Sequence, residues 1–346
     1  MTITATTRPQ APGTRRGPRG RSGAIADRGR PRRLWTWPLA LGVLLTLGLV
    51  AASLFVGVYD VLGASDGAEM FAITRIPRTV TLVLSGAIMA MSGLVMQMIT
   101  QNRFVEPTTT GTTEWAGLGL LLVMVVAPEA SLLGKMAGAI VMAFIGTMVF
   151  FAFLQKVTLK SSIIVPIVGI MLGSVVGAVS SYVALSTNML QSLGIWFAGS
   201  YTSVIKGQYE PMWAIIAVLV VIWFAADRFT AAGLGRDVAT SIGINYRQVV
   251  FLGTGLIALA TGIVTVVVGN LPFLGLIVPN LVSMVRGDDL RSNLVWVALT
   301  GVCIVTACDL IGRTVIMPFE VPASLILAIL GAAVFITMIL RRRPRG

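Results

Sequence analysis

The sequence contains no histidine and only two cysteines, Cys303 and Cys308, among its 346 residues. Without histidine there is no His-dependent catalytic triad, and the commonest protein metal ligand is missing. The cysteines lie five positions apart in one apolar stretch, on different faces of a helix, so we expect buried free thiols without a disulfide or metal site. No G-x-x-x-x-G-K-[ST] phosphate loop occurs. We therefore predict that the chain is not an enzyme, has no catalytic residues, and neither binds a cofactor nor hydrolyses ATP by itself.

Charge is also scarce in this chain. Charged residues make up 12% and hydrophobic residues 56% of it, whereas soluble domains carry roughly 25% charged and 45–50% apolar residues. A water-soluble globule of this length has no place for the excess apolar side chains. The composition excludes a soluble enzyme, a secreted disulfide module and a disordered protein, and it predicts a protein that resides in a lipid bilayer.

The few charges are unevenly placed along the chain. The first 33 residues hold nine arginines and one acid, and four arginines stand among the last six residues, so these tails account for the formal net charge of +12. Basic residues beside apolar segments follow the positive-inside rule, which favours two cytoplasmic tails, 1–33 and 341–346, over a nucleic-acid-binding surface. The N-terminal tail is predicted to be disordered and to contact anionic lipid. Two cytoplasmic termini require an even number of spans.

Residues 34–340 form the predicted transmembrane domain. A helical span needs about 20 mostly apolar residues, and ten apolar runs approach this length. They lie at 34–58, 79–100, 113–127, 132–155, 161–187, 211–227, 247–270, 273–286, 294–314 and 320–340. The weakly apolar segment 189–206 is either a short external helix or an eleventh span that would break the even count. The sequence thus predicts an all-α integral membrane protein with about ten transmembrane helices.

One predicted span carries small residues at four-residue spacing, at Gly169, Gly173, Gly177 and Ser181. Residues four apart share a helix face, and small residues on that face let two backbones approach closely in lipid. We expect this face to pack against another helix of the same subunit, and favour that over a dimer contact.

Three polar stretches interrupt the apolar pattern, and polar groups at membrane depth tend to mark interior faces or substrate pathways. The first opens as R-x-P-R-T at Arg75 and ends as N-x-x-x-x-P-T-T-T-G from Asn102. The second is G-x-x-x-A-x-x-x-G from Gly235, and the third is G-L-x-x-P-N-x-x-x-x-x-x-G-D from Gly275. The chain closes with D-L-I-G-R-T from Asp309 and a P-x-E-V-P motif.

In this order, these motifs resemble the FecCD family of ABC-importer permeases, which includes the vitamin B12 and ferric-siderophore permeases. The resemblance extends from about Ile73 to the C-terminal arginines, roughly four-fifths of the chain. It implies the type II ABC importer permease fold, in which spans two to five and seven to ten form two inverted halves. Asn280, where the family more often has His, and the stretch Pro107–Gly111 look like the subgroup that imports catecholate-type ferric siderophores.

The resemblance also implies partners for this chain. Two permease subunits, here a heterodimer in preference to a homodimer, would enclose one pathway in the bacterial plasma membrane. Two ATPase subunits, which carry the ATP and magnesium, would dock below, and an extracytoplasmic siderophore-binding protein would deliver the cargo. No nucleic-acid partner is expected.

The same resemblance assigns roles to particular residues. The segment at about 231–247 matches the coupling helices that contact the ATPase. The residues expected to couple to the ATPase are Gly235, Arg236, Asp237, Ala239, Gly243 and Arg247. The candidates for the translocation pathway are Arg75, Arg78, Gln97, Gln101 and Asn280, although capping or packing roles are equally compatible with the sequence.

The leading hypothesis is a permease subunit that imports a ferric siderophore. The nearest alternative is the same machine with cobalamin, haem or another metal chelate as cargo. An ion-coupled secondary transporter is a different class, and it would carry intramembrane carboxylates as coupling sites. The chief acids near membrane depth, Asp309 and Glu320, are both expected at the end of a span.

Overall fold

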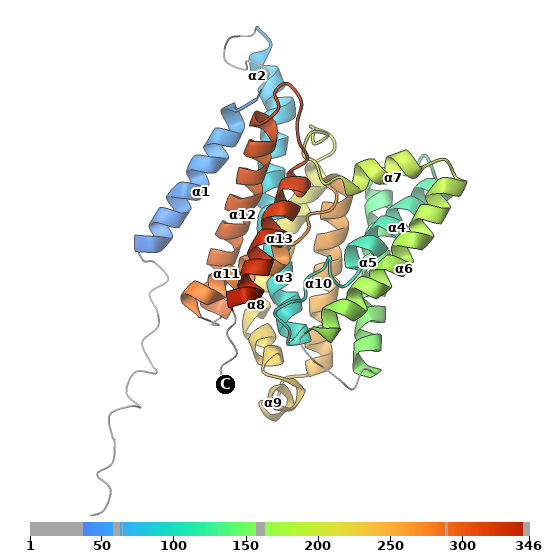
Figure 1. The fold of residues 1–346 in the computed structure, drawn as a ribbon, viewed down its shortest axis with the longest axis vertical. Helices are drawn as coiled ribbons and strands as arrows, with labels where there is room; N and C mark the ends of the chain where they lie inside the picture. The colour runs from blue at the N-terminus through green and yellow to red at the C-terminus, as the bar shows by residue number, and fades with distance from the viewer. Residues whose placement is uncertain (1–36, 58–62, 64, 157–162, 288–289, 342–346) are drawn as a thin grey trace, which may run out of the picture. The chain divides into compact units, whose positions relative to one another are not determined.

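The computed structural model describes residues 37–57, 63, 65–156, 163–287 and 290–341. The predicted tails 1–33 and 341–346 lie outside these residues, apart from the last residue of the final helix. Within the described residues the regular structure is helical throughout, which confirms the predicted all-α class. Figure 1 shows these helices as a bundle in which distant parts of the sequence lie side by side.

Each of the ten predicted apolar runs corresponds to a helix. They are α1 (Trp37–Phe55), α3 (Ile76–Thr100), α4 (Thr112–Val126), α5 (Leu132–Lys156), α6 (Ile164–Ser186), α8 (Ala214–Gly233), α10 (Tyr246–Val267), α11 (Leu274–Arg286), α12 (Leu290–Thr314) and α13 (Ala323–Arg341). In the part of the chain that the structure describes, seven helices are long and apolar enough to cross a membrane, whereas α4, α11 and α13 contain shorter apolar stretches. The short segments are α2 (Gly67–Met70), a π-helical turn (Phe71–Arg75), α7 (Leu190–Phe197), a 3₁₀ turn (Glu210–Trp213) and α9 (Arg236–Ser241).

The structure decides between the two alternatives for residues 189–206. The helix in this segment, α7, has 8 residues, which gives it a length of about 12 Å. A bilayer core is about 30 Å thick, so α7 is too short to span, and the segment does not add an eleventh crossing.

The helix lengths and contacts repeat in two halves. The series α3, α4, α5 and α6 has 25, 15, 25 and 23 residues, and α10 to α13 have 22, 13, 25 and 19. Helix α3 packs against α11 and α12, just as α10 packs against α4 and α5. Each half therefore supplies one long helix that packs against the other half.

Helix α3 lies at the centre of the bundle, and 89% of its most apolar stretch is buried. Small residues let its neighbours approach, because a methyl group added at Gly86 would lie 2.9 Å from the Gly301 carbonyl oxygen of α12. At Gly93 an added methyl group would overlap the backbone of Gly275 in α11. These two contacts hold α3 against the second half without intervening side chains.

Candidate functional site

The segment between α8 and α10 forms a turn–helix–turn at one end of the bundle, where α9 projects beyond the other helices (Figure 1). Gly235 precedes α9 with φ of 108°, and Gly243 follows it with φ of 83°. Residues with a side chain rarely adopt this backbone conformation. Ala239, midway between them, is fully buried. The structure therefore explains why two positions of this motif are glycine and the middle one has a small side chain.

The opposite side of α9 is exposed and partly apolar. Leu234, Val238 and Ile242 stand four residues apart and are 64%, 44% and 58% exposed. Arg236, Asp237 and Arg247 are also exposed. Apolar side chains exposed in such a row beside charges are typical of a surface that another protein covers.

Both ends of this segment contact the last turn of α3. At the first end, a methyl group added at Gly233 would lie 2.9 Å from the Met98 sulfur atom. At the second end, the Tyr246 hydroxyl donates a hydrogen bond to the carbonyl oxygen of Ile99, at 3.2 Å. This carbonyl belongs to the last turn of α3, where helix carbonyls lack intrahelical donors.

A cavity of about 250 Å³ lies beside these contacts. Its lining comes from the ends of α3, α8, α11 and α12 and includes three of the predicted pathway residues, Gln97, Gln101 and Asn280. Gln101 ends α3 in the left-handed conformation, with φ of 52°, and its side chain is exposed. The cavity is smaller than the 300–1,000 Å³ of sites that hold drug-sized ligands.

Gln97 has a role inside the subunit that follows from a proline. Pro279 in α11 has no N–H, so the carbonyl four residues earlier, at Gly275, loses its helical donor. The Gln97 side-chain amide of α3 donates to that carbonyl oxygen at 3.3 Å. The next residue, Asn280, uses its side-chain amide to hold the carbonyl oxygens of Arg103 and Leu276, at 2.8 and 2.6 Å.

The start of α11 is capped by a buried acid that the sequence analysis did not select. Glu106 is fully buried in the connection between α3 and α4. Its carboxylate accepts hydrogen bonds from the Phe273 backbone N–H at 2.9 Å and the Thr108 hydroxyl at 2.5 Å. A carboxylate at a helix N-terminus is stabilised by the unpaired N–H groups there, so the first half of the chain fixes the start of α11.

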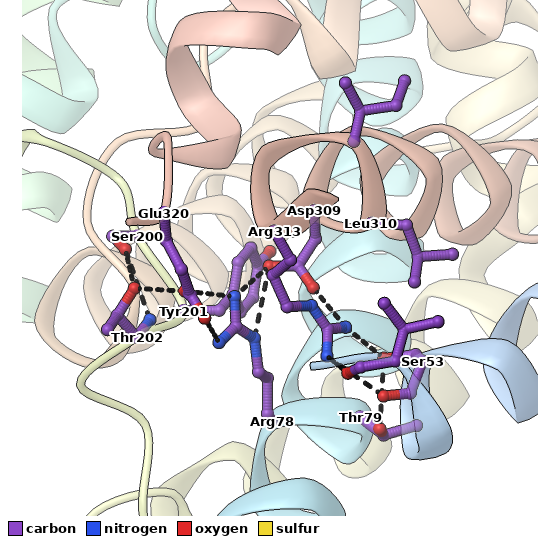
Figure 2. Close-up of polar contacts among 12 residues, drawn as sticks. Ser53, Arg78, Thr79, Ser200, Tyr201, Thr202, Asp309, Leu310, Arg313 and Glu320 are labelled. Carbon is purple, nitrogen blue, oxygen red and sulfur yellow. Dashed lines mark hydrogen bonds and ion pairs between the residues drawn. The ribbon is translucent and has the colours of Figure 1, made fainter. Parts of the chain in front are cut away.

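The other end of the bundle holds a network of charged residues (Figure 2). Arg78 donates to Asp309 at 2.7 Å and makes a bidentate contact with Glu320, at 3.1 and 2.8 Å. Asp309 lies 2.6 Å from Arg313, and the Thr202 hydroxyl donates to Glu320 at 2.7 Å. The side chains of Asp309 and Arg313 are 2% and 1% exposed. Two positive and two negative groups thus neutralise each other with little contact to solvent.

Glu320 lies in the connection between α12 and α13, where its side chain is 26% exposed. Partial burial by itself raises the pKa of this carboxyl, but the hydrogen bonds and charge of Arg78 outweigh that effect and hold the pKa below its usual value.

Arg75 and Arg313 close the end of α1. Arg75 donates to the Val56 carbonyl oxygen at 2.6 Å. Arg313 donates to the same oxygen at 2.9 Å and to the Ser53 hydroxyl at 2.7 Å. Arginine side chains that satisfy the last carbonyls of a helix act as its C-terminal cap, so α1 is attached to α3 and α12 at this end.

A comparison with protein families agrees with the motifs and the fold. The model of the FecCD transport family matches residues 39–341. The chain belongs to the FecCD transport family. It is a multi-pass membrane permease and not an enzyme.

Two related permeases and one solved structure align with nearly the whole length of this chain. The petrobactin import system permease protein FatD of Bacillus anthracis is 58% identical over 90% of this chain and 94% of its own length. The petrobactin import system permease protein YclN of Bacillus subtilis is 38% identical over 87% and 97%. A solved structure of a metal-chelate type ABC transporter in an inward-facing conformation superposes with a TM-score of 0.76 at 23% identity, over 88% of this chain and 99% of that one. At this identity the likeness shows the fold alone.

The FecCD motifs identified in the sequence separate into two groups in space. Gln97, Gln101 and Asn280 lie at the end that carries α9, whereas Arg75 and Arg78 lie in the charged network at the opposite end. A role in the pathway remains a prediction for all five. Arg75, Arg78, Gln97 and Asn280 each donate hydrogen bonds to groups inside the subunit.

The small-residue face of α6 also divides into two parts. A methyl group added at Gly169 would overlap the Thr109 carbonyl, and one at Gly173 would lie 3.1 Å from Gly111, so the first two glycines face the connection into α4. Gly177 has open space around it and Ser181 is exposed. Helix packing by all four residues remains a prediction.

Two contributions to this site escaped the sequence analysis. Glu106 lies inside the N-x-x-x-x-P-T-T-T-G motif, but a single acid has no spacing signal that would predict its role. Pro279 is part of a motif identified in the sequence, but the motif does not tell which residue donates to the Gly275 carbonyl that this proline leaves without a helical donor.

Proposed function

We propose that this chain is the permease subunit of a bacterial plasma-membrane ABC importer that carries a ferric siderophore into the cytoplasm. The observation that carries the proposal is the 58% identity, across nine-tenths of the chain, to a permease named for petrobactin import. Petrobactin is therefore the first siderophore to test. The catecholate-type interpretation of the sequence motifs leads to the same class of cargo.

In this proposal α9 is the contact with the ATPase. The helix projects from the bundle between two glycines, and the row Leu234, Val238 and Ile242 is exposed beside Arg236 and Asp237. This combination suits a groove on a soluble protein that is lined by both apolar and charged side chains. Binding and hydrolysis of ATP with magnesium would take place on that partner, which is present in two copies.

The geometry supports a pathway between two subunits and not within one. The cavity near α9 has a volume of about 250 Å³, too small for a chelated iron complex of drug-like size. Helix α6 buries only one narrow stripe of its surface, and large apolar residues such as Ile170, Val175 and Tyr182 are exposed. A second permease subunit, favoured as a different but similar chain, would cover part of this surface, and lipid would cover the rest.

The proposed orientation places α9 and both termini in the cytoplasm. The charged network at the other end, with Glu320 and the connection that follows α7, then faces outward, where an extracytoplasmic binding protein docks. The arginine-rich tails support this orientation through the positive-inside rule. The domain boundaries proposed are a tail at 1–33, a permease domain at 34–340 with its coupling segment at about 231–247, and a second tail at 341–346.

The experiment is radio-iron uptake in cells that lack this gene, with iron loaded on petrobactin and a panel of other siderophores. We expect uptake of one siderophore class to be lost and to return with the wild-type gene. Uptake should not return with Gly235, Ala239 and Gly243 all changed to leucine. These changes strain two positive-φ positions and overfill a buried one. Gly48→Leu is the control, because nothing lies within 4 Å of a methyl group added there.

Ferric chloride, haem and cobalamin are tested in the same cells. Loss of cobalamin or haem uptake with normal siderophore uptake would agree with an ABC importer and would contradict the proposed siderophore cargo. Uptake that persists after ATP depletion but collapses with the proton gradient would contradict the ABC proposal in favour of a secondary transporter.

A further inference from the structure

Helix α3 is not connected in sequence to the coupling segment, yet it contacts the segment at both ends. Gly233 lies against Met98 at the end of α8, and Tyr246 at the start of α10 bonds to the Ile99 carbonyl. The segment itself is continuous with α8 and α10 only. A displacement of the segment therefore acts on α3 directly through these two contacts, in addition to the packing of α8 and α10 against α3.

The other connections of α3 lead to the start of α11. Gln97, one turn before Gln101, donates to the Gly275 carbonyl. One turn further along, the backbones of Gly93 and Gly275 touch with no side chain between them. A contact between backbones cannot be absorbed by a change of rotamer, so the first turn of α11 must follow when this end of α3 shifts sideways.

The surroundings allow such a shift at one end and resist it at the other. The cavity beside Gln97 and Gln101 leaves space at the end of α3 that faces α9. The contacts of this end with the coupling segment include a neutral hydrogen bond and a methionine thioether, and no ion pair among the described residues holds it. The opposite end of α3 is held by the buried ion pairs of Arg78.

We infer that α3 transmits movement from the coupling segment to the start of α11 in this permease. The coupling segment acts on α3 at Met98 and through Tyr246, and α3 acts on the first turn of α11 through Gly93 and Gln97. This inference rests on the proposed function, because it requires that the coupling segment moves with an ATPase. Tyr246 and Met98 are positioning residues here, since neither is required to touch the cargo.

The test uses the complete importer, reconstituted in liposomes with its two ATPase subunits and the binding protein. Iron–petrobactin uptake and ATP hydrolysis are measured on the same vesicles. Tyr246→Phe keeps the ring and removes the hydroxyl. We expect hydrolysis to stay within about twofold while uptake per ATP falls about three- to tenfold, the factor that loss of one partly buried hydrogen bond produces. Thr337→Val likewise removes one hydroxyl, an exposed one whose hydrogen bond lies within α13, and should leave the uptake per ATP unchanged.

A second pair of variants tests the contact at the other end. Gly233→Ala pushes a methyl group towards the Met98 sulfur atom, and Met98→Ala removes that atom. We expect each single change to lower uptake per ATP, and the double variant to recover part of the loss. A non-additive recovery of this kind is the signature of a direct contact.

The outcomes separate the two proposals. If the wild-type complex hydrolyses ATP but imports no chelate of any class, the proposed function fails. If the wild type imports and Tyr246→Phe shows unchanged uptake per ATP, the transmission role of α3 is wrong. Equal losses of hydrolysis and uptake in Tyr246→Phe would also overturn it, because they indicate damaged assembly and not lost transmission.

Discussion

The two ends of this permease are held together by different chemistry. Opposite α9, the ends of α3 and α12 and the connection to α13 are joined by ion pairs among Arg78, Asp309, Arg313 and Glu320. Beside α9, the contacts that hold α3 are neutral, namely a side-chain amide, the Tyr246 hydroxyl and backbone approaches at glycine. Buried charges are costly to separate, whereas neutral contacts beside a cavity are cheaper to rearrange. The difference suggests one fixed end and one end that can move.

Removing one member of the charged network should have the largest effect on stability. Asp309→Asn leaves Arg78 and Arg313 buried without their shared counter-charge, and we expect the free energy of unfolding to fall by about 3–5 kcal/mol. Denaturation of the purified protein in mixed micelles measures it. The control is Asp227→Asn, a carboxylate that is 68% exposed. Equal stability of the two variants would show that the network does not hold this end together.

Removing a side-chain amide at the α9 end should have an intermediate effect on the free energy of unfolding. Gln97→Leu leaves the Gly275 carbonyl without a donor in a buried place, which costs about 1–3 kcal/mol. Adding Pro279→Ala should restore much of the loss, because position 279 then regains a backbone N–H that reaches this carbonyl. Gln155→Leu, at an exposed position of α5, is the control. A double variant no more stable than Gln97→Leu would contradict the role of Gln97.

Glu320 should contribute less than Asp309 to the free energy of unfolding, and its contribution should depend on pH. The Arg78 contact holds the pKa of Glu320 below its ordinary value, so the stabilisation is present at neutral pH. It is lost as the pH falls through the lowered pKa, because the folded protein must then take up a proton at a paired site. The measurement is the difference in unfolding free energy between wild type and Glu320→Gln from pH 7 to pH 3. A difference that stays constant below pH 4 would rule out this linkage.

The sequence predicts the helices of this fold far better than it predicts their contacts. The length of an apolar run is a local property of the sequence, so each of the ten predicted runs corresponds to a helix. The spacing of Gly235 and Gly243 is also visible in the sequence, and their positive φ explains it. The partners of Arg78 stand 231 and 242 positions away, and the partner of Gln97 stands 178 positions away. No periodicity links such distant residues. A predicted site can therefore name the right polar residues without telling whether each faces cargo or another helix.

The smallest effect is expected for an ion pair whose closest approach equals that of the Arg78–Asp309 pair. Arg291 and Asp227 approach to 2.7 Å, as Arg78 and Asp309 do, but their side chains are 61% and 68% exposed. Exposed charges lose little solvation when they pair, and salt screens them. A double-mutant cycle with Arg291→Gln and Asp227→Asn should give a coupling of about 0.2–1 kcal/mol that declines in high salt. A coupling as large as the loss in Asp309→Asn would mean that distance and not burial decides the strength of these pairs, and the contrast between the two ends would then have to be explained in another way.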